Sequence, residues 1–424
     1  MYGTAGVSGR REQWTGHARG SRGYRGVLIG LAAAGMATFA QLYSLQGVLP
    51  GLAADLDISA SSAALTVSAA TLGLAAAVIP WSAAADRFGR LPIMRVAILA
   101  AVVLGLAVPF SPNLPALLIL RFIEGAAMGG IPAVALAYLS EEVSRVHAAV
   151  AAGSYVSGTT IGGLAGRIVA APLSDAANWR IGVGAVSLLA AVAAVVFMLT
   201  APKQQGFLPL RRTDPGPGLG GRLLAQLRNP RQVGLYLQAF LLMGGFVAVY
   251  NYLGFRLGAA PFSLPQSLAS FLFLAYLAGT WSSRAAGSLA GRLSGRGGRR
   301  TVLLCSIAVM AAGLALTLAA WLPAVIAGLV VFTAGFFAAH SIASGWAPFL
   351  ATEGRAQASS LYNLFYYAGS SLLGWIGGFF FQLWGWSGLS AFVGVLLAAA
   401  AAAAAAVLTP ESGPAAAKPA LGKP

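Results

Sequence analysis

Charged side chains are scarce in this chain of 424 residues, where Asp, Glu, Lys and Arg make up 9%, against about 25% in an average soluble domain. Hydrophobic residues make up 58%, and the mean hydropathy is +0.77. So few polar side chains cannot cover a folded chain that faces water on all sides, which argues against a soluble enzyme, a disordered protein or a secreted scaffold. The single cysteine, Cys305, excludes an intrachain disulfide.

The sequence contains many long apolar windows that are nearly free of charged residues. A bilayer core needs about 20 apolar residues in a helix, and twelve windows of suitable length can be drawn. They cover residues 26–50, 61–81, 93–110, 114–138, 147–172, 181–201, 233–253, 264–283, 301–322, 323–350, 356–381 and 385–408. Only a short turn separates the two windows within 93–138, and the same holds for the two within 301–350. Eleven crossings is therefore the main alternative to twelve. The sequence predicts an all-α integral membrane protein.

The basic residues fall on one side of these windows. With both ends of the chain in the cytoplasm, 23 of the 27 Lys and Arg residues lie in cytoplasmic segments or, for Arg95, at the cytoplasmic end of a window. Arg121, Arg167, Arg180 and Arg256 are the exceptions. Such an excess marks the cytoplasmic side, which predicts a multi-pass protein of the cell (inner) membrane with both termini inside. The net charge of +16 then needs no nucleic-acid partner.

A glycine-rich segment divides the windows into two sets of six. Residues 203–232 contain a run of Gly and Pro between positions 216 and 221, typical of a flexible linker. We expect a basic cytoplasmic tail at 1–25, helical bundles at 26–202 and 233–409, a cytoplasmic linker at 203–232, and a second cytoplasmic tail at 410–424. The first 25 residues lack the apolar stretch of a cleavable signal peptide.

The two sets of windows share a weak internal repeat. Asp86-Arg-Phe-Gly-Arg90 is echoed by Gly295-Arg-Gly-Gly-Arg299 at an offset of 209, and Gly158-Thr-Thr-Ile-Gly-Gly163 by Gly369-Ser-Ser-Leu-Leu-Gly374 at an offset of 211. A nearly constant offset predicts two pseudo-symmetric six-helix bundles related by an axis along the membrane normal. A substrate would lie between them, near the middle of the membrane.

The segment after the second window resembles the G-x-x-x-D-R-x-G-R-K/R signature of the major facilitator superfamily, with Ser82 and Leu91 as departures. The resemblance implies the fold of that superfamily and a loop that helps to keep the cytoplasmic side closed. The matching positions are Asp86, Arg87, Gly89 and Arg90 in the first copy and Arg296, Gly298 and Arg299 in the second. The arginines can equally be charges that only fix orientation.

Further segments are similar to one side of this superfamily. Arg121-Phe-Ile-Glu-Gly125 resembles the R-x-x-x-G motif of proton-coupled members, and the glycine-rich window 147–172 resembles a helix of drug/proton antiporters. The segments 250–256, 335–346 and 364–371 look like the arabinose-efflux and acriflavine-sensitivity branch. The resemblance implies a proton-coupled exporter.

Glu124 is the acidic residue that lies deep within a predicted membrane helix. Arg121 precedes it by three residues, so the two side chains share one helix face and can pair. A carboxyl group that gains and loses a proton there would couple transport to protons, with Arg121 modulating it; a static ion pair is the alternative. His340 could relay protons, or could be a hydrogen-bonded packing residue.

Polar and aromatic residues in other windows are candidates for the substrate cavity. They are Gln41, Tyr43, Arg167, Asn251 and Tyr366. Gln41, Tyr43 and Gln46 form a polar stripe on the first window. Each of these positions is also compatible with an ordinary interfacial residue.

The sequence predicts a secondary active transporter that works by alternating access and exports drugs, sugars or other small molecules in exchange for protons. A proton-coupled importer or facilitator is the alternative. The sequence contains no Gly-x-x-x-x-Gly-Lys-Ser/Thr loop of the kind that binds ATP. Its three histidines are scattered, which disfavours a membrane enzyme. A channel is disfavoured by the repeat. We expect no cofactor or metal, and we favour a monomer.

Overall fold

The computed structural model describes residues 14–144, 146–207, 219–293, 297–351 and 354–408, and these ranges contain helices and turns but no β-strand. The α-helices are α1 (Arg22–Leu42), α2 (Leu49–Asp55), α3 (Ala60–Phe88), α4 (Arg90–Ala107), α5 (Leu114–Met128), α6 (Ala135–Glu142), α7 (Ala148–Ala176), α8 (Trp179–Thr200), α9 (Leu219–Arg228), α10 (Pro230–Gly258), α11 (Gln266–Ser270), α12 (Tyr276–Arg292), α13 (Gly298–Leu316), α14 (Leu322–Leu350) and α15 (Arg355–Val407). Three short 3₁₀ helices are η1 (Gln46–Val48), η2 (Val108–Phe110) and η3 (Phe271–Ala275).

The predicted windows correspond to these helices. Eight helices in the described ranges are long and apolar enough to cross a membrane. One of them, α15, contains a kink at Trp384 and Gly385 and therefore makes two crossings. Three more crossings come from the pair α5 and α6, from α7, and from the series α11, η3 and α12. The described helices therefore agree with twelve crossings.

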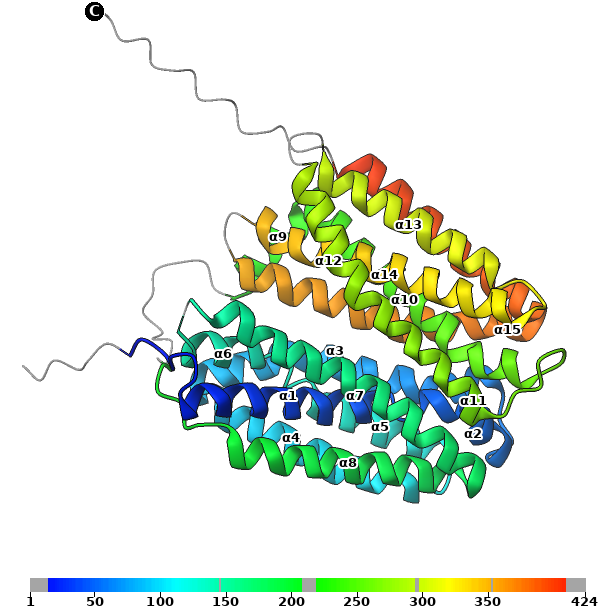
Figure 1. Cartoon of the computed structure of the whole chain (residues 1–424), viewed down its shortest axis with the longest axis horizontal. Helices are drawn as coiled ribbons and strands as arrows, with labels where there is room; N and C mark the ends of the chain where they lie inside the picture. The colour runs from blue at the N-terminus through cyan, green and yellow to red at the C-terminus, as the bar shows by residue number, and fades with distance from the viewer. Residues whose placement is uncertain (1–13, 145, 208–218, 294–296, 352–353, 409–424) are drawn as a thin grey trace, which may run out of the picture.

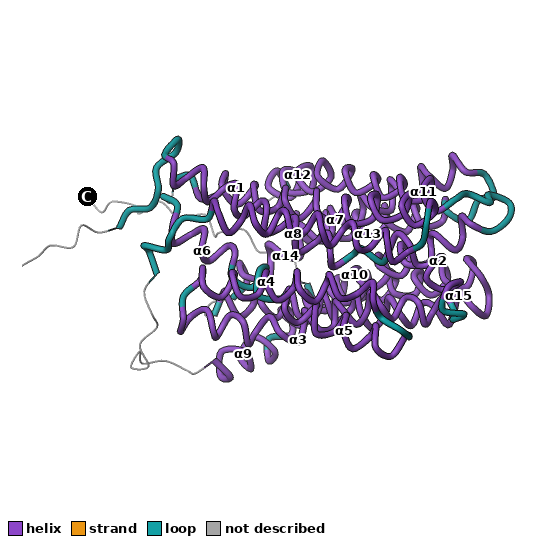
Figure 2. The backbone as a smooth tube through the Cα atoms, turned by 90° about the horizontal axis from the view of Figure 1, so that it is seen from below, coloured by secondary structure: helices purple, strands orange, loops and turns teal. Residues whose placement is uncertain are grey.

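The helices gather in two bundles that lie one above the other in Figure 1. We call α1–α8 the N-bundle and α10–α15 the C-bundle. Figure 2 shows that most helices run along the same axis. We call the end that carries Tyr24, Glu141 and Gln204 the terminal end, and the opposite end, with Asp55 and Gln266, the far end. Between the bundles, α3 packs against α15, and α7 packs against α11.

Glycines allow matching helices to pack closely in both bundles. A Cβ atom on Gly158, Gly162 or Gly166 of α7 would lie 2.1–2.4 Å from a backbone carbonyl oxygen of α1. In the C-bundle, a Cβ atom on Gly369 of α15 would lie 2.1 Å from the carbonyl oxygen of Phe240 on α10. Only glycine fits such backbone contacts, which explains why window 147–172 is rich in this residue.

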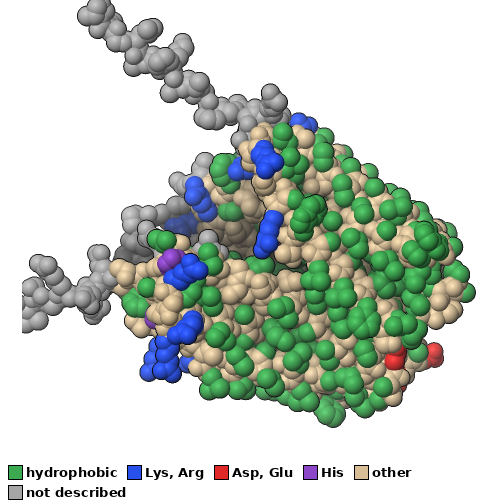
Figure 3. Space-filling view, viewed as in Figure 1, with side chains coloured by type: hydrophobic (Ala, Val, Ile, Leu, Met, Phe, Trp, Pro, Cys, Tyr) green, Lys and Arg blue, Asp and Glu red, His purple; other side chains and the backbone are tan. Residues whose placement is uncertain are grey.

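The surface carries the charge pattern that a membrane protein needs. Hydrophobic side chains cover the middle of the molecule in Figure 3, whereas Lys and Arg gather at the terminal end. The same view shows a recess between the two bundles at the terminal end. A separate pocket of about 550 Å³ lies between η3, α12 and α14 and is lined by apolar side chains such as Phe271, Leu322 and Ile326.

The segment 203–232, predicted as a flexible linker, contains a helix and a bonded start. Residues 219–228 form α9, because Leu219, Leu223 and Leu227 recur at helical spacing after the Gly/Pro run ends. At the start of the linker, the backbone N–H groups of Gln205 and Gly206 donate to Glu142 Oε1 at 2.6 and 2.8 Å. Residues 208–218, like the tails at 1–13 and 409–424, lie outside the described residues.

Candidate functional site

A break in the first crossing places polar backbone groups inside the N-bundle. Helix α1 ends at Leu42, and the chain resumes as η1 and then α2. Pro50 lacks an N–H group and its ring clashes with the carbonyl of Gln46 in a continuous helix, which favours interruption here. The last carbonyl groups of a helix have no intrahelical partner, so those of Gln41 and Leu42 need donors from outside α1. Ser44 N and Oγ donate to Gln41 O at 3.2 and 2.9 Å, and both carbonyl groups have further donors on α5.

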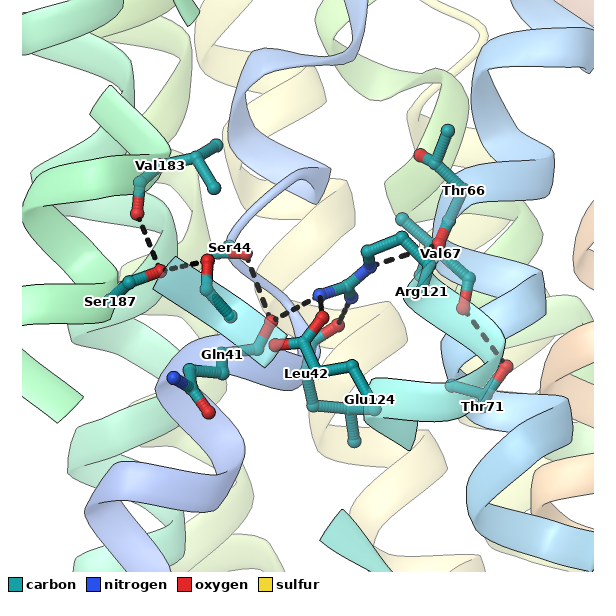
Figure 4. Close-up of polar contacts among 11 residues, drawn as sticks. Gln41, Leu42, Ser44, Thr66, Val67, Thr71, Arg121, Glu124, Val183 and Ser187 are labelled. Carbon is teal, nitrogen blue, oxygen red and sulfur yellow. Dashed lines mark hydrogen bonds and ion pairs between the residues drawn. The ribbon is translucent and has the colours of Figure 1, made fainter. Parts of the chain in front are cut away.

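Arg121 on α5 supplies these donors. Its Nη1 donates to Gln41 O at 3.1 Å, its Nη2 to Leu42 O at 2.8 Å, and its Nε to Thr66 O on α3 at 3.3 Å. Nη1 also binds Glu124 Oε2 at 2.6 Å (Figure 4). The guanidinium is fully buried, and its bonds tie α3 and α5 to the break in α1.

Glu124 is bound on one side only. Its Oε2 pairs with Arg121, whereas its Oε1 has no hydrogen-bond partner among the described residues, and the Nε2 atom of Gln41 has none either. Both atoms face Gly105 of α4, because a Cβ atom there would lie 2.4 Å from Gln41 Nε2 and 2.9 Å from Glu124 Oε1. The free oxygen can accept a proton without first breaking the bond to Arg121. Gly105 was not among the residues predicted for this site.

His340 lies in the other bundle, on α14. Its Nδ1 is 3.0 Å from the hydroxyl of Tyr362, and its ring stacks on Phe336 and lies 4.8 Å from the ring of Tyr366. The structure therefore joins Tyr366 to His340, and it joins Arg121 to Glu124. It provides no direct contact among the described residues between His340 and the ion pair, so the three predicted proton-coupling residues form two separate groups.

Arg167 on α7 joins several of the predicted cavity residues. Its Nε donates to Gln46 Oε1 at 2.7 Å, and Gln46 Nε2 donates to Asn251 Oδ1 on α10 at 2.6 Å. The guanidinium lies 4.1 Å from the ring centroid of Tyr43. Its Nη2 is 3.3 Å from the hydroxyl of Tyr276 on α12, a residue that the sequence did not single out. This chain of contacts crosses from one bundle to the other.

The loop between α3 and α4 is held within the N-bundle. Arg90 pairs with Asp86 and with Glu141 on α6, at 3.1 Å for Glu141. Gly89 has a φ of +98°, a conformation that glycine adopts without strain, and it lies against Gln204. Arg87 lies beside the ring of Phe88, at 5.1 Å from its centroid.

In the second copy of this loop, Gly298 begins α13, and the guanidinium of Arg299 lies 3.8 Å from the ring centroid of Phe349 on α14. Arg296 lies outside the described residues. Glu141 and Gln204 were not among the predicted loop residues, because their approach depends on α6 and on the start of the linker.

Hydrogen bonds between the bundles, within the described ranges, lie in the far half of the molecule. Ser267 N of α11 donates to Asp175 Oδ2 of α7 at 2.7 Å, and Gly51 N donates to Gln266 Oε1 at 3.0 Å. Ser371 Oγ of α15 donates to Ser68 O of α3 at 2.8 Å. The bundles thus meet at the far end, opposite the recess at the terminal end.

A sequence profile of the family described as the Major Facilitator Superfamily matches residues 29–290 and 259–424. The chain belongs to the major facilitator superfamily. The uncharacterized MFS-type transporter YybF of Bacillus subtilis (strain 168) is 37% identical over 379 residues, 89% of this chain and 92% of that protein. The inner membrane transport protein YnfM of Escherichia coli (strain K12) is also 37% identical over 379 residues, 89% of each chain.

A solved structure shares the fold of this major facilitator protein. A bacterial homologue of the human lysosomal transporter Spinster, in an inward-facing and unoccupied conformation, matches with a TM-score of 0.74 and covers 94% of this chain and 100% of its own. At 16% identity, the likeness concerns the fold alone. The chain is thus a multi-pass membrane transporter of the major facilitator superfamily, with the all-helical fold that the sequence predicts.

Proposed function

We propose that this chain is a proton-coupled exporter that exchanges a small molecule for protons by alternating access, and that Glu124 carries the proton. The observation that supports this most is the carboxylate of Glu124, whose Oε2 binds Arg121 and whose Oε1 has no hydrogen-bond partner in the described part of the chain. An ionisable group inside a membrane protein is costly and usually functional. Resemblance to drug/proton antiporters favours export over import.

Proton binding at Glu124 would act on the break in the first crossing. The carboxylate becomes neutral when Oε1 gains a proton, and the ion pair with Arg121 loses its charge attraction. Arg121 and Glu124 both lie on α5, so the bonds from Arg121 to Gln41 O and Leu42 O on α1 and to Thr66 O on α3 would remain, but the carboxylate would no longer fix the guanidinium that makes them. This change would let α1 and α5 move relative to each other, which is how a proton could bias the two conformations of the transporter.

Alternating access requires the bundles to separate at one end while they close at the other. We place the chain in the cell (inner) membrane with both termini in the cytoplasm, because Lys and Arg gather at the terminal end. The recess between the bundles would then open to the cytoplasm. The bonds from Asp175 and Gly51 to α11 would close the outer side.

The test is proton movement by the purified chain in proteoliposomes. A pH-sensitive dye reports protons while lipophilic cations, sugars and aromatic carboxylates are added in turn. We expect a transported compound to move protons with the parent, and Glu124→Gln to bind that compound without moving protons. Asp55→Asn is the matched control, since it removes a carboxylate that pairs with Arg180 at the far end and leaves α5 unchanged.

Two results would overturn the proposal. If Glu124→Gln moves protons as well as the parent, Glu124 is a structural partner of Arg121. If the compound and the protons move in the same direction across the membrane, the transporter is a proton-coupled importer. Inverted and right-side-out vesicles distinguish the two directions.

A further inference from the structure

The two fully buried arginines of the membrane region differ in how their charge is balanced. Arg121 is 0% exposed and pairs with Glu124. Arg167 is 1% exposed, and no Asp or Glu of the described residues forms an ion pair with it. A membrane interior penalises an uncompensated charge heavily. The charge of Arg167 at the contact between the bundles is therefore not balanced by an ion pair within the described residues.

The polar groups around Arg167 offer donors in excess of acceptors. An arginine has five N–H groups. Three of those on Arg167 reach Gln46 Oε1, Gly163 O and the Tyr276 hydroxyl oxygen, and the other two have no hydrogen-bond partner among the described residues. Because that hydroxyl accepts from Arg167, its own hydrogen can be donated. The Nδ2 atom of Asn251, a residue 1% exposed, has no partner in the described part of the chain. A surplus of donors around a cation fits an anion.

Aromatic rings surround the same guanidinium. Their centroids lie 4.1 Å (Tyr43), 4.8 Å (Phe273) and 4.9 Å (Tyr276) from its central carbon. Tyr276 in turn contacts Phe246 and Phe337 at 5.3 and 5.7 Å between ring centroids. Rings disperse a positive charge without neutralising it. They also form a wall that suits a flat apolar body better than a sugar, which needs polar partners for its hydroxyl groups.

We propose that Arg167, with Asn251 and Tyr276, recognises the carboxylate of a small aromatic acid, and that this acid is the class of substrate transported. The proposal rests on the transport function proposed above and names one class among the drugs, sugars or other small molecules that the sequence predicts. Recognition takes place where the bundles meet, so binding the acid replaces contacts such as Gln46 to Asn251 that now join them.

The test is binding of defined probes to the full chain in detergent, followed by thermal unfolding. A ligand that binds the folded chain raises its unfolding midpoint, and at a fixed ligand concentration the shift increases with the logarithm of the affinity. Benzoate and phenylacetate are the probes, benzamide and benzylamine are their neutral and cationic counterparts, and sodium chloride matches the ionic strength. The variants are Arg167→Gln, which removes the charge, and Arg167→Lys, which keeps it. Arg256→Gln is the control, because it removes another arginine flanked by aromatic rings.

We expect the carboxylates alone to stabilise the parent, with affinity about tenfold or more lower in Arg167→Gln, partly restored in Arg167→Lys and unchanged in Arg256→Gln. Stabilisation by benzylamine or equally by benzamide would overturn the proposal, as would no effect of either carboxylate. If Arg167→Gln does not fold, the proposal is decided by two other results: whether the parent prefers carboxylates to benzamide and benzylamine, and whether Arg167→Lys binds the carboxylates more weakly than the parent. If Arg167→Gln bound the carboxylates as tightly as the parent, Arg167 would serve only to join the two bundles, and the proposal would be wrong.

Binding in detergent needs no proton gradient. A negative result here therefore rejects the aromatic acid and leaves proton coupling untouched, whereas a failure of Glu124→Gln to alter proton movement rejects the coupling and leaves the acid as the bound ligand.

Discussion

Arg121 Nη1 and Glu124 Oε2 form an ion pair at 2.6 Å inside the N-bundle, and Arg121 also donates hydrogen bonds to the carbonyl groups of Gln41 and Leu42 at the end of α1. Removal of one member of a buried pair leaves the other charge without compensation, which costs about 3–5 kcal/mol. The pair thus links the stability of the bundle to the site that we propose for the proton.

We expect Arg121→Leu to lower the thermal unfolding midpoint strongly, because the charge of Glu124 remains buried and unpaired. The double variant Arg121→Leu with Glu124→Leu should recover part of the loss, since it removes both charges. It should remain below the parent, because Leu42 O loses the donor Nη2 and Gln41 O loses one of its donors. Unfolding of the purified chain in detergent checks this order. A double variant less stable than Arg121→Leu would show that Glu124 is not destabilised by the loss of its partner.

The contact between α1 and α7 gives a second prediction. Gly158→Ala places a methyl group 2.1 Å from Ala32 O, so the two helices must separate, at a cost of about 1–3 kcal/mol. Gly153→Ala on the same helix meets nothing within 4 Å and should be neutral or stabilising by up to about 1 kcal/mol. The two unfolding midpoints should therefore move in opposite directions or differ clearly. Equal midpoints would show that α7 adapts without strain.

The sequence predicted the elements that depend on local pattern. The apolar windows agree with the helices to within several residues, and even the division of α15 at Trp384 and Gly385 falls between the predicted windows 356–381 and 385–408. The pairing of Arg121 with Glu124 followed from their spacing on one helix.

Contacts that join distant segments could not be predicted in this way. Gln46 and Asn251 are 205 residues apart, and their bond depends on how the bundles meet. Gly105 touches the Glu124 site because α4 crosses beside α1 and α5, which no spacing in the sequence reveals. The roles proposed for His340 and for the loop from Asp86 to Arg90 remain predictions.

The orientation in the membrane can be tested with single cysteines in a Cys305→Ser background. Pro112 lies in an exposed turn at the far end, and Arg228 is exposed at the end of α9 near the terminal end. We expect a membrane-impermeant maleimide to label Pro112→Cys on intact cells and Arg228→Cys only after the cells are permeabilised. The opposite pattern would place the termini outside and reverse the assignment of the recess.

Alternating access predicts that a covalent link at the far end stops transport. Ser267 N and Asp175 Oδ2 are 2.7 Å apart across the bundles, so cysteines at these two positions should form a cross-link in the conformation described here. In the Cys305→Ser background, we expect oxidation of Asp175→Cys with Ser267→Cys to abolish transport of the compound that moves protons in proteoliposomes, and reduction to restore it. Each single variant, treated in the same way, should keep transporting. Transport that continues in the fully cross-linked double variant would mean that the bundles need not separate at the far end, and alternating access in this form would be wrong.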